Sequence, residues 1–310
     1  MNKIEFGDCR TIMRQWAKDD IKVQTCVTSP PYYGLRDYGH EGQLGLEKTP
    51  EEYIANMVEV FRCVRDVLAD NGTLWLNIGD SYSGSGKGTA GNLGKKYNER
   101  HMEHTHSSGL IPEGCKPKDL IGIPWMLAFS LRADGWYLRQ DIIWHKPNPM
   151  PESVQDRCTK AHEYIFLLSK SQKYYYDHEA ISEQSIHYGT DKRSDLGDIR
   201  HEGKRTQGES AANGQQSFVT VNETRNKRSV WTVNTKPYEG AHFAVFPSDL
   251  IEPCIMAGAP VGGVVLDPFM GSGTTAQVAQ NLGRKYMGCE LNPEYKTLQD
   301  NRLHQFALEL

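Results

Sequence analysis

No apolar run in this 310-residue sequence approaches the about 20 residues that a membrane-spanning helix needs. Residues 1–8 lack the apolar core of a secretory signal peptide. The seven cysteines are scattered and include no Cys-x-x-Cys pair, which disfavours both a disulfide framework and a zinc site. We therefore expect a cytoplasmic protein with reduced thiols and no contact with a membrane.

The sequence also lacks a strong charge of either sign. The net charge of -4 gives no global sign of a polyanionic partner, so any basic surface must be local. His101, His104 and His106 lie close together, but no acid or cysteine completes a metal-ligand spacing, and a solvated loop is favoured over a metal site. The length allows one large core, or one core with a smaller recognition module.

Alternating strand and helix patterns predict an α/β fold. Thr49, Pro50 and Glu52 form a typical helix start, and Asn71-Gly72 is a typical helix end. Tyr174–Tyr176 is a candidate edge strand. Strands are expected at 3–6, 23–28, 73–78, 137–144, 163–169, 263–269 and 285–290, and helices at 9–16, from 50, and at 124–131, 248–256, 276–282 and from 293.

Two polar, glycine-rich stretches interrupt this pattern. We predict a flexible DNA-facing insertion at 83–118 and a target-recognition region at 181–235, and the alternative for each is a disordered insertion. The remaining segments, 1–82, 119–180 and 236–310, would form the catalytic and cofactor-binding domain.

The strand expected at 23–28 ends at two prolines, Pro30 and Pro31, followed by Tyr32. Prolines fix φ and cannot donate backbone hydrogen bonds, so the loop is rigid and presents the Ser29 hydroxyl, bare carbonyls and a ring together. Such a loop could accept hydrogen bonds from a flat amine while the ring covers its face. The alternative is an ordinary turn that caps a strand.

A second loop, Gly271-x-Gly273-x-x-Ala276, lies between a strand and a helix, and Glu290 ends the next strand. These are the parts of a nucleoside-binding βαβ unit, in which glycines let the backbone approach the ligand and the acid accepts ribose hydroxyls. Thr274 replaces the lysine of a phosphate-binding loop, which disfavours ATP and GTP, whereas NAD stays open. The carboxyl ends of the strands would bring this loop against the Pro-Pro loop.

Together these residues resemble the β-class of S-adenosylmethionine-dependent DNA amino-methyltransferases, the N4-cytosine/N6-adenine family. Thr28–Tyr32 matches the catalytic motif, Asp267–Thr275 the cofactor motif, and Asp141–Pro149 a late motif that flanks the target base. The resemblance implies a circularly permuted Rossmann-like methyltransferase fold with a mostly parallel central sheet, helices on both faces and an inserted target-recognition region.

The resemblance also implies the site residues. The catalytic residues would be Ser29, Pro30, Pro31 and Tyr32. The residues that bind S-adenosylmethionine would be Asp8, Cys9, Thr28, Phe246, Pro247, Ser248, Asp267, Phe269, Gly271, Gly273, Thr274, Thr275 and Glu290. Candidate phosphate contacts are Arg36, Lys146, Arg225, Lys227 and Arg228, and for each a solvated surface charge is an equal alternative.

The implied reaction is direct methyl transfer to an exocyclic base amine. The Ser29 side chain and the Pro30 carbonyl would accept the two amine hydrogens and polarise the nitrogen lone pair toward the methyl sulfonium. Tyr32 would stack on the base, which must be flipped out of duplex DNA.

Ser29 in place of an aspartate favours N4-cytosine as the target, with N6-adenine as the alternative. Methylation of RNA or of a protein amide, and a non-enzymatic DNA-binding protein with an inactive fold, are the competing hypotheses. A homodimer and a cognate restriction enzyme stay open as partners beside double-stranded DNA.

Overall fold

The computed structural model describes residues 1–35, 37, 39–84, 111–185, 223–235 and 246–304. The chain divides into two compact units, residues 1–177 with 228–310 and residues 178–227, and each is described by itself. Within the described ranges, no helix has the length and apolar character needed to cross a bilayer.

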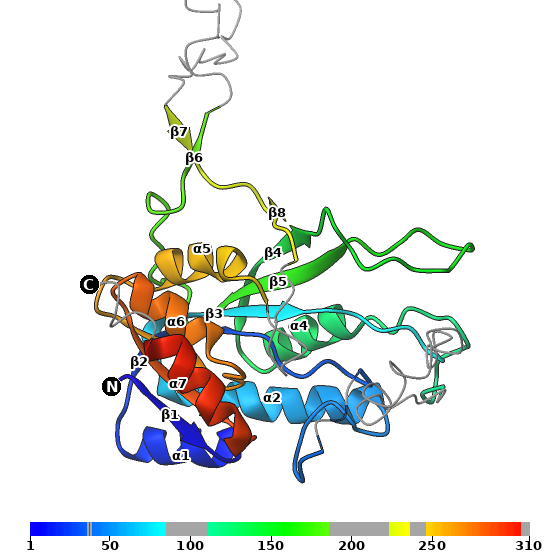
Figure 1. Cartoon of the computed structure of the whole chain (residues 1–310), viewed down its shortest axis with the longest axis horizontal. Helices are drawn as coiled ribbons and strands as arrows, with labels where there is room; N and C mark the ends of the chain where they lie inside the picture. The colour runs from blue at the N-terminus through cyan, green and yellow to red at the C-terminus, as the bar shows by residue number, and fades with distance from the viewer. Residues whose placement is uncertain (36, 38, 85–110, 186–222, 236–245, 305–310) are drawn as a thin grey trace, which may run out of the picture. The chain divides into compact units, whose positions relative to one another are not determined.

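An eight-stranded sheet forms the centre of the larger unit, in the order β1-β10-β9-β2-β3-β5-β4-β8 (Figure 1). Strand β5 is antiparallel to β3 and β4, and the other neighbouring strands are parallel, so the predicted mostly parallel sheet is confirmed. The strands are β1 (Lys3–Phe6), β2 (Val23–Thr28), β3 (Leu68–Ile78), β4 (Tyr137–His145), β5 (His162–Ser169), β8 (Val230–Thr232), β9 (Val264–Asp267) and β10 (Lys285–Glu290).

The order of the strands is permuted relative to the sequence. β9 and β10, from the end of the chain, lie between β1 and β2, from its beginning. Short βαβ crossovers therefore connect β1 to β2 and β9 to β10, and the two pairs meet where β9 lies against β2. The carboxyl ends of the parallel strands face the same edge of the sheet, the edge at which α/β proteins bind ligands.

Helices cover both faces of the sheet (Figure 1). On one face, α1 packs on α2 and α2 on α4, whereas on the other face α5 packs on α6 and α6 on α7. Pro253 lies inside α5, which remains continuous around it. The helices are α1 (Cys9–Lys18), α2 (Pro50–Val67), α4 (Ile123–Ala133), α5 (Ser248–Gly258), α6 (Thr274–Asn281) and α7 (Lys296–His304), the last preceded by a 3-10 turn at Pro293–Tyr295.

Local sequence signals explain where the long helix α2 begins. Thr49 Oγ1 accepts a hydrogen bond from the backbone N–H of Glu52 at 3.1 Å, and Pro50 occupies the first helical position, as predicted. Tyr53 and Phe61 are fully buried in the core between α2 and the sheet. Apolar residues at helical spacing thus fix the face that α2 turns to the sheet.

One predicted helix end and one predicted strand are wrong. The helix ends at Val67, and β3 begins directly at Leu68 and runs through Gly72, where a helix end was expected. A Cβ on Gly72 would lie 2.5 Å from Leu68 Cγ, so the absence of a side chain allows this close strand packing. Tyr174–Tyr176 form no strand. Instead the Tyr176 ring stacks on Trp75, with ring centroids 6.1 Å apart.

The insertion predicted at 83–118 lies largely outside the described residues, but its two ends are visible. Ser83 N donates to Asp119 O at 2.8 Å, and Lys118 N donates to Ser83 O at 2.9 Å. Asp80 Oδ1 accepts hydrogen bonds from the backbone N–H groups of Gly122 and Ile123 at the start of α4. Ser83 and the segment 118–119, near the two ends of the predicted insertion, are therefore hydrogen-bonded to each other.

The smaller unit, residues 178–227, contains a two-stranded antiparallel sheet of β6 (Glu183–Gln184) and β7 (Thr224–Arg225). The end of the predicted target-recognition region, however, does not belong to this unit. Strand β8 pairs in parallel with β4 as an edge of the central sheet, and the role of residues 181–235 in target recognition stays a prediction.

Candidate active site

The carboxyl ends of β2 and β9 bring the two predicted loops together. The strands pair in parallel through Thr25–Cys26 and Val265–Leu266. Two residues later, Thr28 Oγ1 donates a hydrogen bond of 2.6 Å to Asp267 Oδ1, across 239 positions in the sequence. The Pro-Pro loop and the glycine loop therefore leave the sheet side by side.

The Asp267 carboxylate joins these loops. Besides the bond from Thr28, it accepts hydrogen bonds from Thr275 Oγ1 at 2.6 Å and from Phe269 N at 3.0 Å. Burial raises the pKa of Asp267 to about 6, although these three donors oppose the shift. Asp267, Thr28 and Thr275, all predicted as cofactor residues, bond to one another and fix the shape of the loop.

The glycine loop itself is held by Glu290 at the end of β10. Gly271 N donates to Glu290 Oε2 at 2.7 Å, and Asn292 N donates to Glu290 Oε1 at 2.8 Å. From α7, Gln299 Nε2 donates to Gly271 O at 2.7 Å. Gly271 and Gly273 have φ of 54° and 88°, a backbone conformation that residues other than glycine rarely adopt.

The neighbourhood of this loop suits a nucleoside. A carboxylate offers about four acceptor positions, and the backbone N–H groups of Gly271, Leu291 and Asn292 bond to that of Glu290, which leaves room for a further donor. In addition, Ser272 Oγ is buried and has no hydrogen-bond partner among the described residues. Burial raises the pKa of Glu290 to about 7, so its charged form needs further donors to be favourable.

Cofactor binding is therefore expected to depend on pH through Glu290. Hydroxyl donors favour the carboxylate and so should lower its pKa from about 7, with release of a proton on binding near neutral pH. The dissociation constant for S-adenosylmethionine should rise up to about tenfold for each pH unit below the starting pKa. Calorimetry in buffers of different ionisation enthalpy measures the proton count. A count that Glu290→Gln leaves unchanged would contradict this assignment.

Asp8 and Cys9 begin α1 next to this site. Gly7 N donates to Glu290 O at 2.8 Å, so the turn after β1 lies beside the end of β10. Asp8 caps α1 by accepting from the N–H groups of Arg10 and Thr11, at 2.8 and 3.2 Å. Cys9 is buried, and burial raises the pKa of its thiol to about 12.

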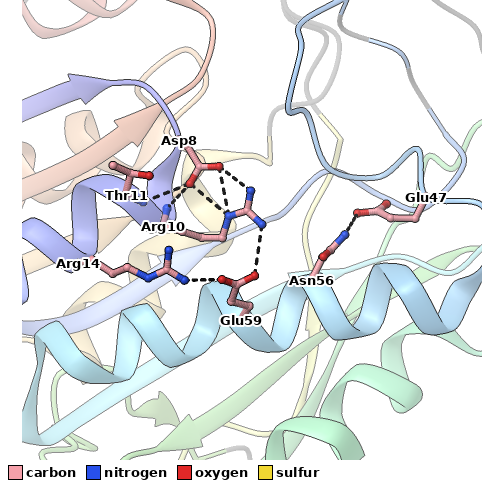
Figure 2. Close-up of polar contacts among 7 residues, drawn as sticks. All are labelled: Asp8, Arg10, Thr11, Arg14, Glu47, Asn56 and Glu59. Atoms are coloured by element: carbon pink, nitrogen blue, oxygen red, sulfur yellow. Dashed lines mark hydrogen bonds and ion pairs between the residues drawn. The ribbon is translucent and has the colours of Figure 1, made fainter.

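The Asp8 carboxylate also binds the Arg10 guanidinium, with an Nη2–Oδ2 distance of 2.6 Å (Figure 2). Partial burial opposes the effect, but the hydrogen bonds from Arg10 hold the pKa of Asp8 below its usual value. Figure 2 shows that Arg10 also reaches Glu59 on α2, which in turn binds Arg14. The carboxylate predicted to contact the cofactor is thus fixed in position by a neighbouring ion pair.

Phe246, Pro247 and Ser248 form the entry to α5, for which Pro247 is the extended residue before the first turn. Pro247 is buried, whereas Phe246 and Ser248 are half-buried. Phe269, in the glycine loop, is half-buried and packs against the main core. Their contacts with a cofactor remain predictions.

Contacts with α2 and with neighbouring backbone hold the Pro-Pro loop in place. Tyr53 Oη on α2 donates to Pro31 O at 2.9 Å, and Gly34 N donates to Gly45 O at 2.8 Å. The Tyr32 ring lies against the backbone of Gly79, where a Cβ would come within 2.6 Å of the ring. These contacts with the protein hold the loop in its conformation.

The Tyr32 hydroxyl enters a polar network that sequence reasoning missed. It donates to Glu163 Oε2 on β5 at 2.7 Å, and Ser29 Oγ lies 3.5 Å from the same hydroxyl. Asn77 Nδ2 on β3 donates to Tyr164 O at 3.1 Å and lies 3.4 Å from Glu163 Oε2. Burial and the Glu163 charge raise the pKa of Tyr32 well above its usual value, so the phenol stays protonated.

Lys146, predicted to contact phosphate, lies in this network. Its ammonium group donates to Glu163 Oε1, and the two side chains are only 17% and 16% exposed. It also lies 4.2 Å from the ring centroid of Trp144. Lys146 therefore neutralises the acid behind Tyr32, and its role toward DNA stays a prediction.

Of the other four predicted DNA contacts, the structure describes three, Arg225, Lys227 and Arg228. Arg36 is outside the described residues. Arg225 is part of the smaller unit, where its Nε donates to Glu183 Oε1 at 3.0 Å. Lys227 is half-buried and Arg228 is exposed.

Comparison with known proteins places the chain in a family. A family model described as "DNA methylase" matches residues 23–300. The type II methyltransferase M.SmaI of Serratia marcescens is 48% identical over 302 residues, which cover 97% of this chain and 90% of the relative. The type II methyltransferase M.Cfr9I of Citrobacter freundii is 47% identical, covering 96% of this chain and 86% of the relative.

Solved structures share the fold. The PvuII DNA methyltransferase, described as cytosine-N4-specific, aligns with a TM-score of 0.61 and 16% identity over 97% of this chain and 85% of that one. A complex of M1.HpyAVI with S-adenosylmethionine aligns with a TM-score of 0.54 and 17% identity over 98% and 100% of the two chains. This protein is therefore a member of the S-adenosylmethionine-dependent N6/N4 family of DNA methyltransferases.

Proposed function

We propose that this DNA methyltransferase modifies the N4 amino group of a cytosine that is flipped out of duplex DNA. The observation that carries the proposal is the junction of β2 and β9, where Thr28 bonds to Asp267 and holds the Ser29–Tyr32 loop beside the glycine loop. A base amine held by the first loop would then face a cofactor held by the second.

Residues of the Pro-Pro loop would prepare the amine. Its lone pair is delocalised into the base ring, so acceptors for the two N–H hydrogens must draw the nitrogen toward tetrahedral geometry. Ser29 Oγ and the Pro30 carbonyl are such acceptors, fixed in place before the base arrives. When bound, S-adenosylmethionine supplies an electrophilic methyl group on its sulfonium.

Around these acceptors, hydrogen bonds set the direction of the hydroxyl groups. The Tyr32 hydroxyl donates a hydrogen bond to Glu163, which leaves the Tyr32 oxygen as an acceptor for the Ser29 hydroxyl. The lone pairs of Ser29 then remain available to the base. The Tyr32 ring would stack on the base, since its hydroxyl is already satisfied by protein groups.

Cytosine is favoured over adenine because a serine, rather than an aspartate, occupies the first position of the loop. The N6-adenine reaction is the second candidate, since both amines have the same geometry and need the same acceptors. Methylation of RNA or of a protein amide is less favoured, because type II methyltransferases match this chain over almost its whole length.

The test is to identify the methylated base directly. DNA from cells that express the protein would be digested to nucleosides for mass spectrometry, and single-molecule sequencing would give the sequence context. We expect N4-methylcytosine at one short recognition sequence. N6-methyladenine would select the second candidate, and no methylated base in any DNA would refute the proposal. A Ser29→Ala variant, which retains the fold but lacks one acceptor, is the matched control.

The proposal extends to partners. Local basic residues such as Lys227 and Arg228 would contact phosphates of duplex DNA, and a cognate restriction enzyme would cleave the same sequence when it is unmethylated. Homodimerisation is a separate part of the proposal, which light scattering of the purified protein would test.

A further inference from the structure

The segment between β4 and β5, residues 146–161, extends beyond the ends of the two strands (Figure 1). We call it the arm. We call residues 147–151 the tip of the arm. Within it, Met150 is 87% exposed, the largest exposed fraction among the large hydrophobic side chains in the described part of the chain. Single exposed apolar residues are common, so exposure alone assigns no role to Met150.

The backbone on both sides of Met150, however, is held by hydrogen bonds. On one side of the tip, Asn148 Nδ2 donates to Thr235 O at 3.1 Å, and Thr235 N donates back to Asn148 Oδ1 at 2.9 Å. On the other side, Glu152 Oε2 accepts from Arg157 Nη1 at 2.6 Å and lies 3.3 Å from Lys160 N. Met150 is thus two residues from an anchor in each direction.

Prolines restrict the tip further. Pro147, Pro149 and Pro151 alternate with Asn148 and Met150, and each fixes its own φ. Residues 147–151 carry no charge, so no carboxylate at the tip would repel a polyanion. The two acids further along the arm are neutralised in ion pairs, Glu152 by Arg157 and Asp156 by Lys118.

The base of the arm leads directly to the catalytic loop. Lys146 binds Glu163, which accepts the hydrogen bond from Tyr32. Met150 follows Lys146 by four residues, so the two Cα atoms are at most about 14 Å apart. An exposed apolar side chain on a restrained backbone is therefore joined by a short segment to the network of Glu163 and Tyr32, in the loop that would hold a flipped base.

We propose that Met150 is a wedge that enters the base stack of duplex DNA and fills the space vacated by the flipped base. This inference rests on the proposed function, because only a flipped base leaves such a gap. Bases follow one another every 3.4 Å, so removal of one leaves about 7 Å between the planes of its neighbours. One layer of aliphatic or sulfur atoms at normal contact distance fills that gap, and inserted methionines are among the known wedges.

The wedge predicts a defect that depends on the pairing of the target base. Met150→Ala should lower kcat/KM on a fully paired duplex by about 10- to 100-fold, since the unstacked state loses its filler. On single-stranded DNA, or on a duplex with a mispaired target base, the variant should work within about threefold of wild type, because less unpairing is needed.

Controls separate this role from others. Met150→Leu retains the apolar bulk and should retain activity on the paired duplex, and Val154→Ala removes another exposed apolar residue of the arm and should have little effect. Thermal unfolding should be unchanged in all three variants, because Met150 and Val154 are surface residues. The duplex would carry the methylated sequence that sequencing identifies.

Two outcomes would overturn the inference. If wild type methylates the duplex and Met150→Ala is equally active, or equally impaired on paired and mispaired substrates, the wedge is refuted while the proposed function stands. If wild type transfers no methyl group to any DNA, the proposed function fails and the wedge fails with it.

Discussion

Replacement of Tyr32 by alanine should abolish most methyl transfer while S-adenosylmethionine still binds. The ring would provide the stacking surface for the base, a contact worth about 1–3 kcal/mol. The ring also packs against Gly79, and this contact helps to hold the loop in place. Loss of both position and stacking should reduce kcat/KM by about 100-fold or more. The cofactor loop is held by separate contacts, from Glu290 and Gln299, so the dissociation constant for the cofactor should change little.

The matched control for this prediction is Tyr32→Phe, which keeps the ring but removes the hydrogen bond to Glu163. A hydrogen bond to a charged group contributes about 1.5–3 kcal/mol, but Glu163 would retain Lys146 and Asn77 as partners. We therefore expect the phenylalanine variant to keep most of its activity. If it were as inactive as Tyr32→Ala, the hydroxyl rather than the ring would be the functional group. Stopped-flow or radiolabelled transfer assays with calorimetric measurement of cofactor binding distinguish these cases.

The parts of the fold that depend on local signals were predictable from the sequence. The apolar run 264–266, the glycine turn and the helix from Thr274 follow one another directly in the sequence, so their order could be inferred without tertiary information. The start of α2 was likewise predictable, because Thr49 and Pro50 satisfy the end of their own helix. The helix end near Val67 was not predictable, since it depends on the packing of Leu68 and Gly72 against β2.

The polar network behind Tyr32 could not be predicted, because it depends on pairing between distant strands. Asn77 and Tyr164 are connected only because β3 and β5 are antiparallel neighbours, and Ile78 pairs with Tyr164 in that register. One signal was present: Asn77 interrupts an apolar strand, and Glu163 opens another. A buried polar residue in such a strand needs a partner, but the sequence does not name it. For the same reason, the contact of Lys146 with Glu163 could not be predicted, and its contact with phosphate stays a prediction.

The Asp8 turn shows a similar limit. Its position as the cap of α1 follows from the sequence, whereas the ion pairs of Arg10 and Arg14 with Glu59 depend on the packing of α1 against α2. The sequence therefore predicts the helix start at Asp8, whereas the fold determines which ion pairs surround its carboxylate.

Gly273→Val should abolish binding of S-adenosylmethionine. Gly273 has a φ of 88°, and a β-branched residue in this region costs about 1–3 kcal/mol, so the loop should relax to another conformation. A Cβ at this position would also lie 3.5 Å from Gln299 Cγ, and the additional methyl groups of valine would press on that side chain. Because Gln299 holds Gly271 O, displacement would disturb the Gly271 N–H that binds Glu290. Calorimetry should detect no binding at cofactor concentrations that saturate wild type.

Strain by itself must be separated from damage to the site, and Gly262 provides the control. It has a φ of 79° and lies before β9, at the opposite end of the strand from the glycine loop, with nothing within 4 Å of a Cβ built on it. Gly262→Val should therefore lower the unfolding temperature about as much as Gly273→Val, since both impose the same backbone penalty. Only the Gly273 variant should lose the cofactor. If both variants lost it, binding would report general instability, and if Gly273→Val bound normally, the cofactor site would have to lie elsewhere on the sheet.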